Sequence, residues 1–203
     1  MATISASTKT VSMKVVYYGP GLCGKTTNLV KLHTRFPEAQ RGALIKLDTE
    51  TERTLFFDYF LANVGSIGGY NVKVNYFTVP GQSFYNATRS VVLDGADGVV
   101  FVADSSPSRE EANLVSFDNM RENLARFNRK LEDIPLVFQW NKRDVPKAIS
   151  EKTLQRALNP KGFPSFTAVA SEGKGVWETQ QAILKLSLEK LQGQQSKARG
   201  LYG

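Results

Sequence analysis

The feature that most constrains the fold of this chain is a short glycine-rich segment, Gly19-Pro20-Gly21-Leu22-Cys23-Gly24-Lys25-Thr26. It has the spacing of a phosphate-binding loop: glycine, four residues, glycine, lysine, and then serine or threonine. Residues 14–18 before it are β-branched and aromatic, which predicts a buried strand. Residues 27–33 after it place Leu29 and Leu32 at helical spacing. A glycine-rich turn that matches by chance is the alternative.

The residue types in this loop suit the binding of a polyphosphate. Glycines let the backbone turn tightly, so that successive N–H groups point at an anion, and the following helix adds the positive end of its dipole. Lys25 is expected to bridge the β- and γ-phosphates as a catalytic residue, and the Thr26 hydroxyl is expected to bind Mg²⁺. We count Thr27 with residues 19–26 as nucleotide-binding.

The composition is that of one globular domain. The chain has 203 residues, of which 41% are hydrophobic, and no apolar run long enough to span a membrane. Cys23 is the single cysteine, which excludes an internal disulfide and suits a reducing cytosol. We expect it to pack as a small side chain; a reactive thiol is the alternative. The net charge of +7 is scattered, so we expect no nucleic-acid partner, although a basic balance keeps that alternative open.

The two ends of the chain are expected to be flexible. Residues 1–12 are polar and lack the apolar segment of a secretory signal, and Ala2 stands where myristoylation would need glycine. The last residues lack a prenylation cysteine, so no lipid anchor is expected. We predict an extension over residues 1–12, a single domain over 13–192 and a tail over 193–203.

Strands and helices alternate along the domain, which predicts a doubly wound α/β fold with a mostly parallel sheet. We predict helices over residues 25–35, 84–93, 109–131, 151–158 and 176–191. Strands are predicted over residues 14–18, 43–47, 61–67, 70–79, 98–104, 134–140 and 163–169. The Gly68-Gly69 turn predicts a hairpin and hence one antiparallel edge strand. Residues 48–54 are expected to form a mobile loop.

Two further motifs follow predicted strands and are therefore expected at the same edge of the sheet as the phosphate loop. The first is Pro80-Gly81-Gln82, and the second is Asn141-Lys142-Arg143-Asp144. A carboxylate in the position of Asp144 can accept hydrogen bonds from the N1–H and 2-amino groups of guanine. Adenine lacks that arrangement, so such a site can discriminate by a factor on the order of 10⁴.

Together the three motifs resemble those of the Ras-like small GTPases over residues 13–192, with their P-loop G domain. Longer blocks are most similar to the bacterial MglA-type GTPases of cell polarity and gliding motility: residues 17–29, 49–58, 78–82 and 141–144. The resemblance implies a cytoplasmic switch, recruited to cell poles, that binds GTP and GDP with Mg²⁺ and hydrolyses GTP. It implies a roadblock-type (MglB-like) GTPase-activating partner and motility or polarity effectors.

The resemblance also implies roles for single residues. Thr54 would bind Mg²⁺ and sense the γ-phosphate, the Gly81 N–H would bind the γ-phosphate, and Gln82 would orient the attacking water. Arg53 would act as a built-in arginine finger, an effect worth ~10³–10⁵ in rate. The alternative for Arg53 is a surface arginine paired with a nearby glutamate. Asn141, Lys142 and Asp144 would bind the guanine base.

Two departures from the broad Ras pattern affect these roles. Thr78 stands where an aspartate normally holds a metal-bound water, so we expect Asp58 or Asp48 to substitute, or Mg²⁺ to be held more weakly. The base loop Val169-Ala170-Ser171 lacks the usual lysine. The Ala170 N–H is expected to reach the guanine carbonyl, with Lys142 covering one face of the base.

The apolar residues beside the switch motifs suit either a partner surface or the core: Leu55, Phe56, Phe57, Phe84 and Tyr85. Two alternatives to the hydrolytic switch stay open at this point. One is a nucleotide-dependent scaffold that hardly hydrolyses GTP, which Thr78 and the missing base-loop lysine motivate. The other is a nucleic-acid-binding GTPase, which only the positive charge motivates.

Overall fold

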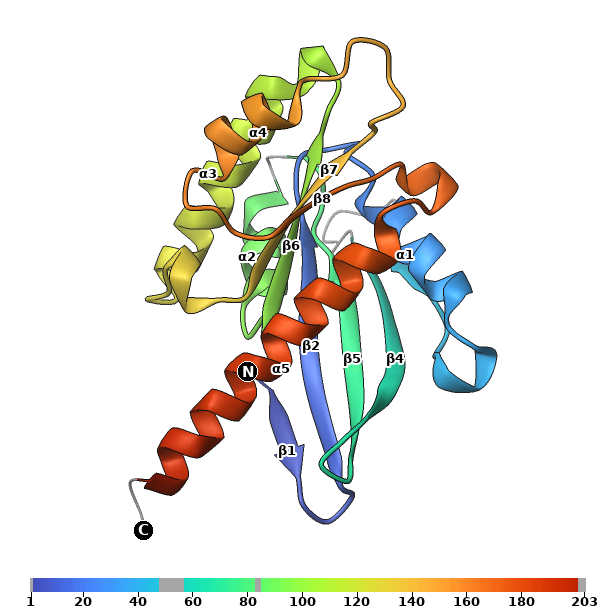
Figure 1. Cartoon of the computed structure of the whole chain (residues 1–203), viewed down its shortest axis with the longest axis vertical. Helices are drawn as coiled ribbons and strands as arrows, with labels where there is room; N and C mark the ends of the chain where they lie inside the picture. The colour runs from blue at the N-terminus through green and yellow to red at the C-terminus, as the bar shows by residue number, and fades with distance from the viewer. Residues whose placement is uncertain (1, 48–56, 83–84, 201–203) are drawn as a thin grey trace.

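The computed structural model describes residues 2–47, 57–82 and 85–200 (Figure 1). The predicted loop over 48–54, with Arg53 and Thr54, and the apolar residues Leu55, Phe56 and Phe84 lie outside these ranges. The described residues form an eight-stranded sheet: β1 Thr3–Ser5, β2 Thr10–Tyr18, β3 Ile45–Leu47, β4 Phe57–Ile67, β5 Tyr70–Thr78, β6 Gly98–Asp104, β7 Leu136–Asn141 and β8 Ser165–Thr167. The helices are α1 Lys25–Arg35, α2 Asn86–Leu93, α3 Glu110–Arg126, α4 Glu151–Leu158 and α5 Val176–Gly200.

The strand order β3-β4-β5-β2-β6-β7-β8 confirms the doubly wound α/β fold. β2 lies between β5 and β6 and is parallel to both, and β7 and β8 continue the parallel part. The hairpin around Gly68 and Gly69 is present, and both glycines have positive φ, +55° and +80°. The antiparallel edge contains β3 as well as β4, so it is wider than the single strand predicted.

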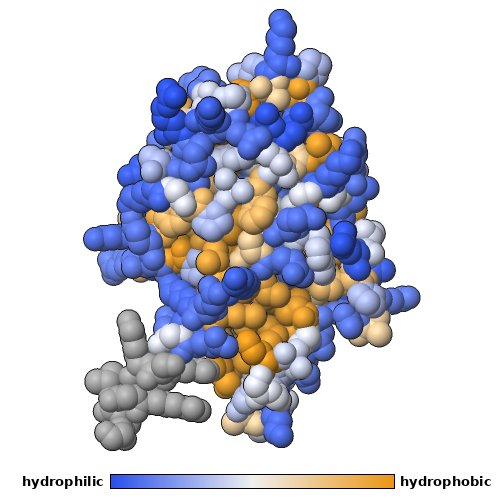
Figure 2. Space-filling model, in the orientation of Figure 1, coloured by the Kyte–Doolittle hydropathy of each residue, from blue (hydrophilic) through white to orange (hydrophobic). Residues whose placement is uncertain are grey.

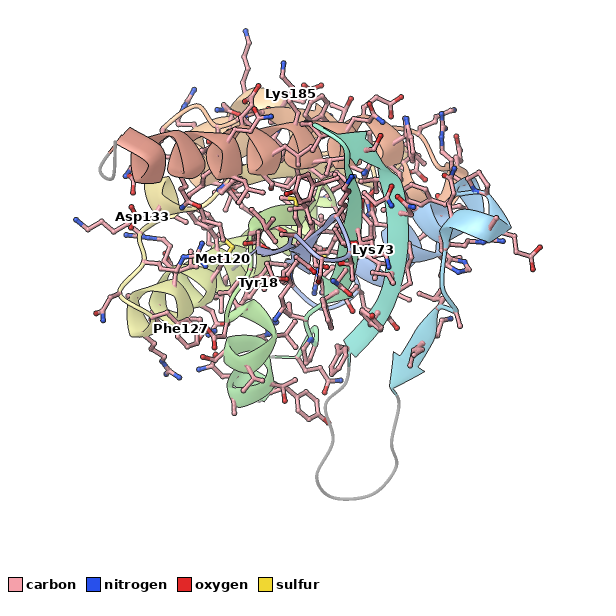
Figure 3. All side chains as sticks on the ribbon, turned by 90° about the horizontal axis from the view of Figure 1, so that it is seen from below. Tyr18, Lys73, Met120, Phe127, Asp133 and Lys185 are labelled. Carbon is pink, nitrogen blue, oxygen red and sulfur yellow. The ribbon has the colours of Figure 1, made fainter. Side chains whose placement is uncertain are left out.

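Helices cover both faces of the sheet (Figures 1 and 3). Val15 and Tyr17 of β2 pack into the core under α1 and α5, together with Leu29 and Ile183. Successive residues of a strand point to opposite faces, so Tyr18 belongs to the second core, under α2, α3 and α4. Figure 3 shows Tyr18 and Met120 on that side, and α5 on the other. Burial on both faces explains the continuous apolar runs in β2, residues 15–18, and in β6, residues 99–103.

The face that carries α5 is mostly polar, with an apolar area beside the lower half of that helix (Figure 2). The apolar side chains that are only partly buried against the core of this face include Val64, Ile67 and Leu188. The cover that α1 and α5 provide is therefore incomplete. Within the part of the chain that the structure describes, no helix has the length and apolarity that crossing a membrane requires.

Within residues 1–12, which the sequence predicts to be a flexible extension, the structure contains a hairpin. β1 pairs antiparallel with the start of β2, with Ile4 opposite Val11, and the Ala2 N–H donates to Asp97 Oδ1 at 2.5 Å. Val11 and Met13 are buried, so the apolar alternation of the first long strand begins earlier than residue 14. These contacts with a distant segment are what order residues whose own composition predicts a loop.

The C-terminal helix also differs from the prediction, because α5 continues to Gly200 instead of ending near residue 191. The residues after 191 include glutamine, lysine, alanine and arginine, which all have favourable helix propensity. Residues 193–200, expected to be a flexible tail, are thus helical in this structure. The division of the chain into a domain with two appendages stays a prediction in its other respects.

Candidate nucleotide-binding site

The phosphate loop connects β2 to α1, as the sequence predicts. Three of its residues have positive φ: Gly19 at +148°, Leu22 at +63° and Gly24 at +101°. A Cβ on Gly24 would collide with the side-chain nitrogen of Asn141, so only glycine fits there. The Leu22 side chain is 87% exposed and does not pack in the core. Cys23 is fully buried, which confirms its packing role, and burial raises the pKa of its thiol.

The start of α1 and Lys25 together provide donors for an anion. The N-cap residue of α1 is Gly24, which has no side chain to satisfy the first N–H groups, and the first turn of the helix contains no acidic residue. Lys25 is 6% exposed, and its Nζ donates to the carbonyl oxygens of Gly19 at 3.0 Å and Pro20 at 2.8 Å. Burial lowers the pKa of Lys25. Negatively charged phosphate at this position would favour the protonated form of Lys25.

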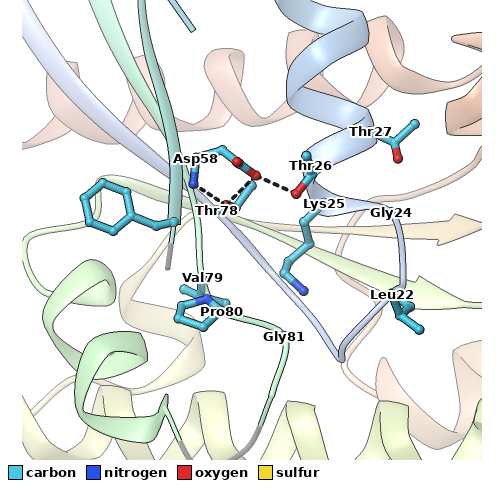
Figure 4. Close-up of a pocket in the computed structure, with 11 residues that line it drawn as sticks. Leu22, Gly24, Lys25, Thr26, Thr27, Asp58, Thr78, Val79, Pro80 and Gly81 are labelled. Atoms are coloured by element: carbon cyan, nitrogen blue, oxygen red, sulfur yellow. Dashed lines mark hydrogen bonds between the residues drawn. The ribbon is translucent and has the colours of Figure 1, made fainter. Parts of the chain in front are cut away.

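Asp58 provides a carboxylate beside the residue that the sequence assigns to Mg²⁺ (Figure 4). The Thr26 hydroxyl donates to Asp58 Oδ2 at 2.5 Å, and the Thr78 hydroxyl donates to the same oxygen at 3.1 Å. The Asp58 N–H donates to Thr78 Oγ1 at 2.8 Å, which fixes this pair of residues on β4 and β5. Of the two predicted substitutes for an aspartate at position 78, Asp58 lies at the site, and Asp48 lies outside the described residues.

A cavity of about 340 Å³ is bounded by these groups, and Lys25, Thr26, Asp58, Thr78 and Gly81 line it. Gly81 meets the phosphate loop directly, because a Cβ on Gly81 would come within 2.5 Å of the Gly21 Cα. The loop after β5 therefore lies against the phosphate loop. The neighbouring Gln82 is exposed, at the rim of this contact.

Asn141 joins the two sides of the site. Its Nδ2 donates to the Cys23 carbonyl oxygen at 2.8 Å, and its Oδ1 accepts from the Ala170 N–H at 2.9 Å. The Ala170 N–H is therefore held by a side chain that the local sequence of the base loop does not reveal, because a buried amide needs a partner. Its contact with a guanine carbonyl stays a prediction.

Lys142 and Asp144 follow Asn141 at the end of β7. Lys142 has a positive φ of +61°, and its Nζ donates to Asp104 Oδ2 at 2.7 Å. The Asp104 side chain is almost fully buried at the end of β6. Burial alone would raise its pKa, but the hydrogen bonds from Lys142 and Ser106 outweigh burial, and the pKa of Asp104 lies below its ordinary value. Asp144 is exposed.

The structure thus brings the phosphate loop, Asp58, Gly81 and the residues after β7 to one edge of the sheet. Sequence reasoning missed Asp104. The signal available in the sequence was a carboxylate at the end of a buried strand, β6, which lies next to the central strand β2. Arg53 and Thr54 are not placed, since they lie outside the described residues.

Comparison with known proteins agrees with this geometry. The sequence model of the ADP-ribosylation factor family (Arf) matches residues 1–192. The chain is also 48% identical over 191 residues to the mutual gliding-motility protein MglA of Myxococcus xanthus (strain DK1622). The aligned residues cover 94% of this chain and 98% of that protein. The phosphate loop, the loop after β5 and the residues after β7 lie at the edge of the sheet where ligands of this fold bind. The chain therefore belongs to the Arf family of Ras-like small GTPases, and it binds and hydrolyses GTP.

Proposed function

We propose that this chain is a GTP-dependent switch that controls gliding motility and cell polarity. The observation that carries the switch is the contact between Gly81 and Gly21 beside Lys25. The two loops that meet there are those that the γ-phosphate of GTP would touch. Binding and loss of that phosphate would therefore change how the loops pack. The motility role is supported by the printed name of the 48% identical relative.

The phosphate groups of GTP would be held by the loop amides of residues 19–27 and by Lys25. Gln82, exposed at the rim, would orient the attacking water, and Arg53 would stabilise the charge that develops on the γ-phosphoryl group. The leaving group is GDP, whose phosphates keep the contacts to the loop. Loss of the γ-phosphate would release the Gly81 N–H from its acceptor.

The donor set of the cavity fits Mg²⁺, because hydroxyl and carboxylate oxygens are the ligands that this hard cation prefers. The Thr26 and Thr54 hydroxyls would bind the ion directly. Asp58, already hydrogen-bonded to Thr26, would accept from a metal-bound water. When bound, Mg²⁺ neutralises negative charge on the phosphate oxygens.

Recognition of guanine would rest on Asp144, with Lys142 beside the base. The pair of hydrogen bonds that Asn141 makes to Cys23 and Ala170 holds the end of β7 against the phosphate loop. Base and phosphate subsites therefore keep a fixed spacing. The Ala170 N–H, which Asn141 holds at the edge of this site, would donate to the guanine carbonyl.

The proposed partners are a roadblock-type (MglB-like) GTPase-activating protein and motility or polarity effectors. Among the predicted contact residues, Phe57 is only partly buried, against the core under α2 and α3. Phe57 thus packs partly against the core. The location of the chain in the cytoplasm and at cell poles stays a prediction from the family resemblance.

Single-turnover hydrolysis tests the catalytic proposal. Gln82→Ala should slow GTP hydrolysis at least tenfold without reducing GDP affinity, while Gln181→Ala, an exposed glutamine on α5, should leave the rate unchanged. Equal rates for Gln82→Ala and the native chain would reject the role of Gln82. Calorimetry with GTP, GDP and ATP, with and without Mg²⁺, tests the nucleotide specificity.

The motility role has its own test. We expect this chain, expressed in Myxococcus xanthus cells that lack their gliding-motility relative, to restore gliding. The Lys25→Ala variant should not restore it, because it cannot hold the phosphates. If the native chain reaches normal protein levels and does not restore gliding, the motility role is rejected. The conclusion that the chain hydrolyses GTP would not be affected by that result.

A further inference from the structure

Arg89 on α2 is a buried cation that holds the loop after β5. Arg89 is only 3% exposed. The Nε donates to the Pro80 carbonyl oxygen at 2.8 Å, and the Nη2 donates to the Gly81 carbonyl oxygen at 2.7 Å. One guanidinium therefore binds two consecutive peptide carbonyls. The two bonds come from different nitrogens of one rigid plane, so their relative directions are fixed, whereas a lysine offers a single nitrogen on a flexible chain.

The environment of Arg89 contains neutral partners. Its Nη1 donates to Asn119 Oδ1 at 3.1 Å, and its guanidinium carbon lies 5.4 Å from the centroid of the Tyr18 ring. No carboxylate among the described residues forms an ion pair with it. Burying a cation without a counter-charge costs stability. The burial of the Arg89 guanidinium is therefore not explained by a gain in stability.

The partners of Arg89 are themselves fixed by a polar network between β2, α2 and α3. The Tyr18 hydroxyl donates to Asn119 Oδ1 at 2.6 Å, and Asn119 Nδ2 donates to Asn86 Oδ1 at 2.8 Å. Asn123 Nδ2 donates to the Tyr18 hydroxyl oxygen at 3.0 Å and to Asn86 Oδ1 at 2.9 Å. The start of α2 is thus tied to α3, and Arg89 cannot shift without breaking several bonds.

The peptide geometry transmits this constraint to the nucleotide site. In a planar trans peptide the N–H points opposite to the C=O, and no cis peptide occurs among the described residues. Because Arg89 holds the Pro80 carbonyl, the Gly81 N–H points away from Arg89. By the same geometry, the hydrogen bond to the Gly81 carbonyl directs the Gln82 N–H. Both Pro80 and Gly81 line the cavity that contains Lys25.

We propose that Arg89 is a positioning residue that aims the backbone N–H groups of Gly81 and Gln82 for recognition of the γ-phosphate. This inference rests on the proposed switch function. It explains why a buried cation is kept on α2: the guanidinium sets the direction of two peptide dipoles before GTP arrives. GDP lacks the γ-phosphate, so its binding does not depend on those dipoles.

The Arg89→Lys variant tests this role, because it keeps the charge and loses the fork. We expect its affinity for a non-hydrolysable GTP analogue to fall roughly tenfold, from the loss of one aligned hydrogen bond. Its affinity for GDP should stay within twofold of the native value, and single-turnover hydrolysis should fall at least tenfold. Arg129→Lys is the matched control: Arg129 also donates to a backbone carbonyl, that of Ala96 at 2.9 Å, outside this cluster.

A purely structural role would reduce both affinities together or only the melting temperature, and either result would overturn the proposal. If Arg89→Lys does not fold, Asn119→Ala decides, since it removes a partner of Arg89 without touching the loop. It should lower the ratio of GTP-analogue to GDP affinity in the same direction, and an unchanged ratio overturns the proposal. If the native chain hydrolyses GTP and both variants keep the native ratio of GTP-analogue to GDP affinity, only the positioning role of Arg89 is rejected. A native chain that binds no GTP rejects the switch as well.

Discussion

The carboxylate of Asp58 accepts a hydrogen bond from the Thr26 hydroxyl at 2.5 Å, although the two residues are 32 positions apart in the chain. Thr26 lies in the first turn of α1, after the phosphate loop, and Asp58 lies on the antiparallel strand β4. The Thr78 hydroxyl donates to the same carboxylate oxygen from β5. A carboxylate is thus provided from the neighbouring strand where Thr78 provides only a hydroxyl.

This relationship predicts that Asp58→Asn weakens Mg²⁺ binding. The substitution keeps the shape of the side chain, removes the charge and replaces one acceptor oxygen with an NH₂ donor, so a metal-bound water loses a charged acceptor. We expect roughly a 10–100-fold rise in the Mg²⁺ concentration that supports GDP binding, which is the usual cost of losing an outer-shell partner. Titration of Mg²⁺ against the fluorescence of a labelled GDP measures it. Asp94→Asn, an exposed residue at the end of α2, serves as the control, and the same midpoint in both variants would contradict the assignment.

The contact between the two loops predicts that Gly81→Ala impairs hydrolysis. The new Cβ would lie 2.5 Å from the Gly21 Cα, which is backbone, so one of the loops must shift. We expect at least a tenfold loss of the hydrolysis rate, since misplacement of reacting groups by about 1 Å costs on the order of 100-fold. Gly193→Ala is the control, because its Cβ would meet no atom within 4 Å. A normal rate for Gly81→Ala would show that the contact is not needed.

The Asp104–Lys142 ion pair predicts a pH-dependent contribution to stability. The folded pKa of Asp104 lies below 3.8, so its carboxylate favours folding above that pH, and this contribution is lost as the pH falls through the folded pKa. Asp104→Asn should lower the free energy of unfolding by about 1–3 kcal/mol at pH 7, because Lys142 loses its partner. The difference from the native chain should shrink below pH 3.8.

Urea unfolding of both chains over a pH series measures this difference. Asp118→Asn is the control, because its ion pair with Arg121 is exposed and is expected to contribute under about 1 kcal/mol. A difference between the native chain and Asp104→Asn that is independent of pH would contradict the assignment of the charge to Asp104.

The exposed carboxylate of Asp144 predicts a change of base specificity. An amide in this place would offer one donor and one acceptor, so guanine would lose one of its two hydrogen bonds, and xanthine, with an oxygen in place of the 2-amino group, would gain one. Asp144→Asn should lower the GTP to XTP affinity ratio by roughly 100-fold or more. Competition between the two nucleotides for the purified variant measures the ratio. Retention of the native preference would exclude Asp144 from base recognition.

Local signals determine much of this fold. The bounds of α1, α4 and β6 agree with the prediction, because a glycine loop, a serine cap and a continuous apolar run mark them in the sequence. The phosphate loop is likewise a local property, since its glycines are needed for positive φ and close approach. The N-terminal hairpin was missed because its order depends on β2.

The sequence by itself therefore determined the family, the order of the central elements and the motifs that are predicted to bind GTP. Only the tertiary structure placed Asp58 on Thr26, engaged the Ala170 N–H with Asn141 and set Arg89 against the Pro80 and Gly81 carbonyls. The physical reason is that these contacts join segments far apart in the chain. Their partners are set by strand register and helix packing, and no local pattern of residues encodes the direction of a hydrogen bond between them.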